Sequence, residues 1–222
     1  MSVPPQRPVP ADPPRIEKAV FLDRDGVLIE DTGYIGRPEQ VVMFPWTAPA
    51  LRRLADAGYK LFVVTNQSGI GRGFYTVEDM QRVNARLEEL LAPAGVRFQR
   101  IYFAPEAPDQ PSRGRKPSPQ FLFDARDEFG IDLGRSYLVG DKLSDLECGW
   151  NAGLARVVLV RTGHGSEVEH RYRERLGQAV LVDHLGAAVD WMLADSRAQG
   201  TPLDPTTAEP MRSPGPASAP AA

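Results

Sequence analysis

Apolar residues along this chain occur in two alternating patterns, short continuous runs and longer stretches in which they recur every three or four positions. A short apolar run suits a strand that is buried on both faces of a parallel sheet. We therefore expect six strands, at residues 19–22, 61–64, 101–103, 137–139, 157–160 and 180–182. The stretches at helical spacing predict helices near residues 47–57, 76–92, 118–129, 143–152, 166–176 and 184–195.

Residues that favour helix ends flank several of these stretches. Thr47 and Thr76 are expected to cap helix N-termini, because a hydroxyl can accept a hydrogen bond from a free backbone N–H. Gly58 and Gly153 are expected to end helices, because glycine adopts the left-handed conformation at low cost. The repeated alternation of strand and helix predicts an α/β fold, a doubly wound parallel sheet with helices on both faces.

The two ends of the chain lack this alternation. Residues 1–14 are rich in proline, and residues 198–222 are rich in Pro, Ala, Ser and Thr. Such segments cannot bury enough apolar surface to offset the entropy of ordering them. We expect a single domain over residues 15–197 between two disordered tails.

Composition narrows the function classes. The net charge is −3 and no lysine-rich stripe is present, so a nucleic-acid partner is not expected. Cys148 is the one cysteine, which excludes an internal disulfide. The chain shows no apolar stretch long enough to cross a membrane and no apolar signal-peptide core near its start. These features predict a soluble cytoplasmic protein that does not bind membranes.

The first predicted strand ends in two carboxylates. Asp23 and Asp25 lie one residue apart, and Gly26 allows the backbone to turn directly after them. Taken alone, this pattern more often caps a turn than forms a catalytic site. Ligands of open parallel sheets bind at the carboxyl ends of the strands, however, and Mg²⁺ would relieve the repulsion between the two charges.

The next three predicted strands also lead into loops with polar side chains. Thr65 ends the second strand and opens a glycine-containing loop whose N–H groups suit a phosphate. Arg115 and Lys116 follow the third strand, with Pro117 expected to open the helix near residue 118, and helix N-termini attract anions. The fourth strand leads into Asp141, a further candidate Mg²⁺ ligand, and Asp145 is expected to support the site from behind its ligands.

In this order and at these strand ends, the four motifs resemble those of the haloacid dehalogenase (HAD) superfamily of phosphotransferases. The chain is similar in particular to the D-glycero-D-manno-heptose 1,7-bisphosphate phosphatases, through residues 21–25, 31–34, 65–73, 75–76, 115–117, 139–145 and 160–163. The resemblance covers roughly residues 17–195 and implies a three-layer Rossmann-like fold. It also implies hydrolysis of a phosphate monoester in ADP- or GDP-heptose biosynthesis.

The resemblance implies a role for each motif residue. Asp23 would be the nucleophile that forms an aspartyl phosphate, and Asp25 would be the general acid and base. Thr65 and Lys116 would hold the transferring phosphoryl group. Mg²⁺ would bind Asp23, the carbonyl of Asp25 and Asp141. The residues implied to line the sugar and its second phosphate are Asp31, Thr32, Gly33, Tyr34, Asn66, Gln67, Ser68, Arg115 and Lys142.

The chain departs from this family at residues 104–114. Many members carry a Cys- and His-containing zinc loop there, whereas this stretch contains neither residue type and several prolines. We therefore expect a proline-stiffened loop without structural Zn²⁺, with catalysis intact. The sequence leaves no room for a large cap domain, because only 39 residues separate Asp25 from Thr65 and 50 separate Thr65 from Lys116. The site should therefore be open. A monomer is the simplest expectation.

The substrate remains open between related phosphate esters. Histidinol-phosphate phosphatases usually have an acid at the position of Ser68, and an uncharged residue suits a sugar better than a cationic amine. Polynucleotide 3′-phosphatases share a similar loop but would need a basic groove. A silent binding domain is also conceivable, although such a domain would typically have lost Asp23, Asp25 or Lys116. His164, His170 and His184 lie away from the motifs and are expected at the surface.

Overall fold

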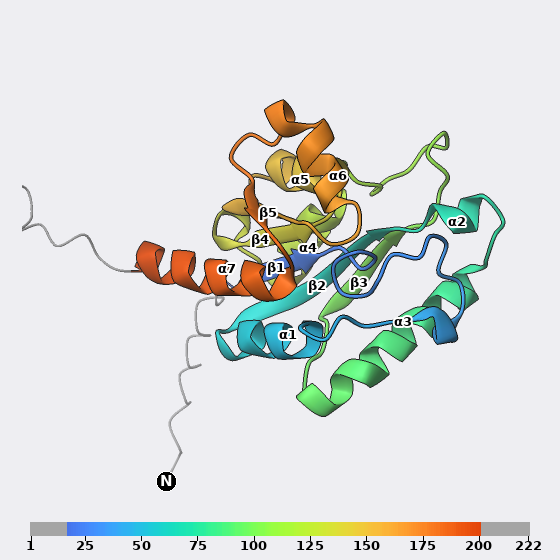
Figure 1. The fold of residues 1–222 in the computed structure, drawn as a ribbon, viewed down its shortest axis with the longest axis horizontal. Helices are drawn as coiled ribbons and strands as arrows, with labels where there is room; N and C mark the ends of the chain where they lie inside the picture. The colour runs from blue at the N-terminus through green and yellow to red at the C-terminus, as the bar shows by residue number, and fades with distance from the viewer. Residues whose placement is uncertain (1–16, 201–222) are drawn as a thin grey trace, which may run out of the picture.

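The sheet contains six parallel strands, and the computed structural model describes residues 17–200 (Figure 1). The spatial order is β3-β2-β1-β4-β5-β6. The strands are β1 (Lys18–Leu22), β2 (Tyr59–Asn66), β3 (Arg100–Ala104), β4 (Tyr137–Gly140), β5 (Arg156–Val160) and β6 (Val180–Val182). The predicted α/β class and doubly wound parallel sheet are confirmed. The two predicted tails lie outside the described residues, apart from the first few positions of the C-terminal one.

Helices cover both faces of this sheet (Figure 1). Alternate residues of β1 point to opposite faces, so that Val20 and Leu22 join one apolar core while Ala19 and Phe21 join the other. The first core is shared with α1 (Thr47–Asp56), α3 (Val77–Leu91) and α7 (Leu185–Gly200). The second is shared with α4 (Gln120–Phe129), α5 (Leu143–Ala152) and α6 (Gly165–Arg171).

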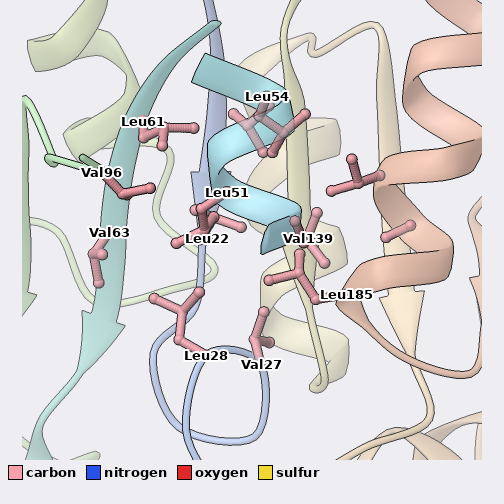
Figure 2. Close-up of a cluster of buried hydrophobic side chains, with 14 of the residues drawn as sticks. Leu22, Val27, Leu28, Leu51, Leu54, Leu61, Val63, Val96, Val139 and Leu185 are labelled. Carbon is pink, nitrogen blue, oxygen red and sulfur yellow. The ribbon is translucent and has the colours of Figure 1, made fainter. Parts of the chain in front are cut away.

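Figure 2 shows how the first core supports the loop that follows β1. Val27 and Leu28 of that loop belong to the same buried cluster as Leu51 of α1, and all three side chains are fully buried. Burying one such aliphatic side chain is worth about 1.5–3 kcal/mol. The loop that carries the two predicted catalytic aspartates is therefore anchored to the core at its far end.

The helix ends agree with the sequence pattern in part. Thr76 caps α3 as predicted, accepting a hydrogen bond from Asp79 N at 3.1 Å, and Gly153 ends α5 with φ +72°. The prediction for Thr47 is wrong, because the N-cap position belongs to Trp46 and the Thr47 hydroxyl donates instead to Leu28 O at 2.8 Å. That bond ties the start of α1 to the loop after β1.

Further short helices occur where the sequence pattern was uninformative. They are α2 (Ser68–Gly71) and four 3₁₀ turns, η1 (Pro38–Gln40), η2 (Ala92–Ala94), η3 (Leu133–Arg135) and η4 (Arg173–Arg175). The helix predicted at 166–176 is divided between α6 and η4. The helix predicted near residue 118 starts at Gln120, so Pro117 does not open it and instead follows Lys116 through a cis peptide bond.

The strand order has a topological switch point between the adjacent strands β1 and β4. From β1 the chain proceeds to β2 and β3 on one side, and β4 then returns to the other side of β1. In open α/β sheets, ligands bind at the carboxyl ends of the strands at such a switch point. Among the described residues, no helix is long and apolar enough to cross a membrane.

Candidate active site

The carboxylate of Asp23 lies directly beyond β1, at the switch point. Its backbone N–H donates to Val139 O at 3.0 Å, which extends the pairing of β1 with β4 by one residue. Its side-chain Oδ1 accepts from Arg24 N at 2.8 Å, and the residue is 5% exposed. Three residues later the chain turns at Gly26 with φ +83°, as the sequence predicted.

Lys116 reaches this carboxylate from the loop that precedes α4. Its buried Nζ lies 3.0 Å from Asp23 Oδ1 and 2.5 Å from Asp145 Oδ1, and it donates to Val64 O at 2.7 Å. Burial lowers the pKa of Lys116, but Asp145 and Asp23 together outweigh it and raise that pKa above its usual value. The site therefore holds a fixed positive charge beside Asp23.

Asp141 lies at the end of β4, and its surroundings fit a bound cation. Its Oδ2 accepts from His164 N at 2.9 Å, whereas its Oδ1 is buried without any hydrogen-bond partner. Burial, followed by the nearby charges of Asp23 and Asp145, raises the pKa of Asp141 to about 8, although Lys142 opposes this shift. An unpartnered carboxylate oxygen of this kind is costly unless a cation accompanies it.

The backbone around Asp141 leaves room only for glycine. A Cβ atom on Gly26 would lie 2.4 Å from Asp141 Oδ2, and a Cβ atom on Gly163 would lie 2.2 Å from the same oxygen. Both glycines have positive φ, at +83° and +58°. The two loops can therefore close around this carboxylate because neither has a side chain there.

Asp145 forms a group of three carboxylates with Asp23 and Asp141. One oxygen of each can lie within 4.8 Å of the others. The Asp145 side chain is already committed, since it pairs with Lys116 and accepts from Lys142 N at 2.9 Å at the start of α5. Asp23 and Asp141 are thus the better cation ligands. The supporting role of Asp145 stays a prediction.

The side chain of Asp25 lines an open cleft of about 240 Å³. Most of the predicted substrate-contacting residues line the same cleft, namely Asp31, Gly33, Tyr34, Asn66, Gln67, Ser68 and Lys142. Thr32 and Arg115 do not line it. Thr32 is exposed, and the Arg115 guanidinium turns toward the loop of residues 104–114, donating to Glu106 O at 3.2 Å.

Asp31 and Lys142 form a charged wall of this cleft. Lys142 Nζ lies 3.0 Å from Asp31 Oδ2, and Gly33 N donates to Asp31 Oδ1 at 2.9 Å. Burial raises the pKa of Asp31, but Lys142 and the Gly33 N–H outweigh it and lower that pKa below its usual value. Asp31 therefore presents an ionised acceptor at the cleft wall.

Two residues of this cleft were missed from the sequence. His164 is exposed, as expected, yet its Nε2 lies 3.3 Å from Asp31 Oδ2 in the cleft wall. Tyr75 also lines the cleft and donates through its hydroxyl to Gln67 Oε1 at 2.7 Å. His164 directly follows the matching segment at residues 160–163, at the same sheet edge, and this position was a usable signal.

Residues 104–114 form the loop that leads from β3 toward Lys116. It is held by its own side chains, since Ser112 Oγ donates to Glu106 Oε2 at 2.6 Å and Ala107 N donates to Gln110 Oε1 at 2.8 Å. Its backbone approaches α2, where Gly71 N donates to Pro105 O at 2.8 Å. Hydrogen bonds therefore order this loop in place of the zinc ligands that its sequence lacks.

Comparisons with known proteins agree with this geometry. A family model described as HAD-hydrolase-like matches residues 114–188. The D-glycero-D-manno-heptose-1,7-bisphosphate 7-phosphatase of Thermosynechococcus vestitus is 39% identical over 187 residues, covering 78% of this chain and 94% of the relative. The D-glycero-beta-D-manno-heptose-1,7-bisphosphate 7-phosphatase of Helicobacter pylori strain J99 is 40% identical over 176 residues, covering 79% of this chain and 97% of the relative.

A solved structure shows the same likeness in three dimensions. The D,D-heptose 1,7-bisphosphate phosphatase from B. bronchiseptica, complexed with magnesium and phosphate, matches with a TM-score of 0.73 and 28% identity. The match covers 80% of this chain and 99% of that protein.

Proposed function

Because this chain belongs to the HAD-like phosphatase family that includes the D-glycero-D-manno-heptose-1,7-bisphosphate 7-phosphatases, we propose that it removes the 7-phosphate from D-glycero-D-manno-heptose 1,7-bisphosphate. The observation that carries the proposal is the buried contact of 3.0 Å between Asp23 Oδ1 and Lys116 Nζ, beside the unpartnered oxygen of Asp141. The carboxyl edge of the sheet would thus hold the nucleophile Asp23, the phosphate-binding Lys116 and the cation-binding Asp141.

The geometry around Asp23 suits attack on phosphorus. Both of its side-chain contacts are made by Oδ1, which leaves Oδ2 as the attacking oxygen. A bond from Oδ2 to phosphorus forms as the bond from phosphorus to the sugar oxygen breaks, giving an aspartyl phosphate. Lys116 and Thr65 stabilise the charge on the phosphoryl oxygens during this transfer.

Asp25 moves the protons of both steps. Its carboxyl group lines the cleft in which the sugar would lie, so it can protonate the departing sugar oxygen. It then accepts a proton from the water that attacks the aspartyl phosphate and releases Asp23. Mg²⁺ held by Asp23, Asp141 and the carbonyl of Asp25 would supply positive charge that offsets the phosphoryl charge.

The walls of the cleft favour a polyhydroxyl substrate. Asp31 accepts hydrogen bonds and Lys142 donates them, a combination that suits sugar hydroxyl groups. Ser68 adds an uncharged hydroxyl at the position where an acid would favour an amine. These groups support a sugar phosphate over histidinol phosphate.

The test is Mg²⁺-dependent phosphate release from the α- and β-anomers of the heptose 1,7-bisphosphate, with histidinol phosphate and a 3′-phosphorylated oligonucleotide in parallel. Asp23→Asn is the control, because it removes the nucleophile and keeps its shape. We expect turnover of a heptose bisphosphate that Asp23→Asn abolishes. Preference for histidinol phosphate would refute the substrate assignment, and absence of any turnover would refute the enzymatic one.

The cellular context belongs to the same proposal. A cytoplasmic location, a monomeric state and a place in heptose biosynthesis remain predictions from the sequence. Light scattering coupled to size-exclusion chromatography tests the monomer directly, and a dimer mass would contradict it.

A further inference from the structure

Arg24, between the two catalytic aspartates in the sequence, is fully buried. Its guanidinium contacts both carboxylate oxygens of Asp25, with Nε 2.9 Å from Oδ1 and Nη2 3.0 Å from Oδ2. It also donates to Asn84 Oδ1 at 2.9 Å and to Gln67 Oε1 at 3.0 Å. A buried guanidinium is costly unless its donors are satisfied, and these four contacts use four of its five N–H groups.

Gln67 connects this arginine to the phosphate side of the site. Its Nε2 donates to Asp25 Oδ2 at 3.0 Å and to Thr65 Oγ1 at 2.9 Å. Its Oε1 accepts from Arg24 and from the Tyr75 hydroxyl. All four hydrogen bonds that a glutamine amide can make are therefore used within the protein, so this amide has none left for a substrate.

Tyr75 is held in place by glycine backbones on two sides. A Cβ atom on Gly69 would lie 2.3 Å from the tyrosine ring, and a Cβ atom on Gly36 would lie 2.7 Å from Tyr75 Cβ. Only glycine allows the ring to lie this close to both segments. The placement aims the Tyr75 hydroxyl at Gln67 and fixes the orientation of its amide.

We propose that Arg24, Gln67 and Tyr75 are positioning residues that hold the Asp25 carboxyl group in the orientation from which, when protonated, it passes its proton to the leaving oxygen. The inference rests on the proposed phosphatase function. Both oxygens of Asp25 accept hydrogen bonds, Oδ1 from Arg24 and Oδ2 from Arg24 and Gln67. These bonds restrict rotation of a side chain that lines an open cleft. General acid catalysis depends on such placement and is typically worth about 10²–10⁴-fold in rate.

A positioning role for these residues predicts a dependence on the leaving group that a purely structural role does not predict. A sugar alkoxide is a poor leaving group and needs a proton from Asp25, whereas nitrophenolate leaves readily without one. Loosening Asp25 should therefore slow the first turnover of heptose 1,7-bisphosphate much more than that of p-nitrophenyl phosphate. A loss of folded protein would lower both rates equally.

The experiment compares Arg24→Lys and Tyr75→Phe with wild type, using enzyme in excess so that only the first turnover is measured. Lysine keeps the charge but cannot bridge both oxygens of Asp25, and phenylalanine removes only the hydroxyl. Asp25→Asn serves as the reference for complete loss of the acid. Arg52→Lys is the matched control, because Arg52 pairs with Asp56 on the exposed side of α1.

With heptose 1,7-bisphosphate we expect a rate loss of about 30–100-fold for Arg24→Lys and about 3–10-fold for Tyr75→Phe, each within the range of the acid's contribution. With p-nitrophenyl phosphate we expect less than about a 3-fold loss for either variant, because nitrophenolate leaves without a proton from Asp25. The control Arg52→Lys should change neither rate. If Arg24→Lys does not fold, Tyr75→Phe decides the question.

Equal losses on the two substrates would overturn the positioning role while Asp25→Asn still discriminates between them. If Asp25→Asn itself fails to discriminate, the acid role in the proposed function falls as well. If wild type hydrolyses neither ester, the proposed function is wrong. The failure of the inference is thus separable from the failure of the function on which it rests.

Discussion

Replacing Asp141 by asparagine should stabilise the metal-free protein at neutral and alkaline pH. The Asp141 carboxylate is fully buried, and its Oδ1 has no hydrogen-bond donor. An asparagine in the same place would keep an oxygen for His164 N and would direct its NH₂ group toward the carboxylates nearby. The variant removes a costly charge and adds an N–H donor group beside Asp23 and Asp145.

The pKa of Asp141 sets the size and the pH range of this effect. Burial, then the charges of Asp23 and Asp145, raise it from 3.8 to about 8. A raised pKa means that the contribution of Asp141 to stability is fully present below pH 3.8 and is lost as the pH rises toward 8. At about 1.36 kcal/mol per unit the ceiling is ~6 kcal/mol, and an effective interior dielectric above that of dry protein reduces it to roughly 2–3 kcal/mol.

Thermal unfolding in the presence of a chelator measures this difference directly. For a chain of this size, 2–3 kcal/mol corresponds to a rise in Tm of about 4–12 °C. Asp141→Asn should exceed wild type by that amount at pH 8 and by little at pH 4, whereas Asp56→Asn on the surface of α1 should match wild type throughout. Added Mg²⁺ should stabilise wild type and leave the variant unchanged. A variant that is less stable at pH 8, or a difference that does not grow with pH, would refute the reasoning.

Three further substitutions test separate parts of the structure. Lys116→Met should abolish phosphate release and, by leaving two buried carboxylates without their cation, destabilise the fold by about 3–5 kcal/mol in denaturant unfolding. Thr76→Ala removes the cap of α3 and should cost about 1 kcal/mol by the same measurement, with activity unchanged. Gly163→Ala would place a Cβ atom 2.2 Å from Asp141 Oδ2 at positive φ, so Mg²⁺ affinity by calorimetry should fall at least about tenfold, by analogy with other disturbed metal-ligand surroundings. An unchanged affinity would contradict that packing argument.

The fold was predictable because its determinants are local and repeated. The four inner strands β1, β2, β4 and β5 are buried on both faces, so each appears as a short apolar run whatever its neighbours are. The edge strands β3 and β6 are partly exposed but are also short apolar runs. The carboxyl ends of parallel strands converge on one edge of the sheet, which brings Asp23, Thr65 and Asp141 together without any knowledge of the loops. Helix starts were less predictable, as Thr47 shows, because its hydroxyl bonds to a loop carbonyl instead of its own helix.

The roles of Arg24 and His164 depended on packing that the sequence order does not reveal. Arg24 lies between two acids, where a surface-exposed salt bridge is the ordinary expectation, yet it turns inward to reach Asn84 on α3, 60 residues away. His164 enters the cleft wall because the loop after β5 closes over Asp141. Both positions follow from the approach of segments that are remote in the chain.

The loop after β2 shows why a polar residue near a site cannot be assigned to the substrate from sequence alone. Asn66 and Gln67 line the cleft, but Asn66 exchanges two hydrogen bonds with the backbone of Lys116, at 3.0 and 3.2 Å. The Gln67 amide donates to Asp25 and Thr65 and accepts from Arg24 and Tyr75. An amide can donate and accept in either setting, so its partner is decided by which groups the fold brings within hydrogen-bond distance. Here the fold supplies protein partners, and substitutions at these two positions should act on catalysis through Lys116 and Asp25.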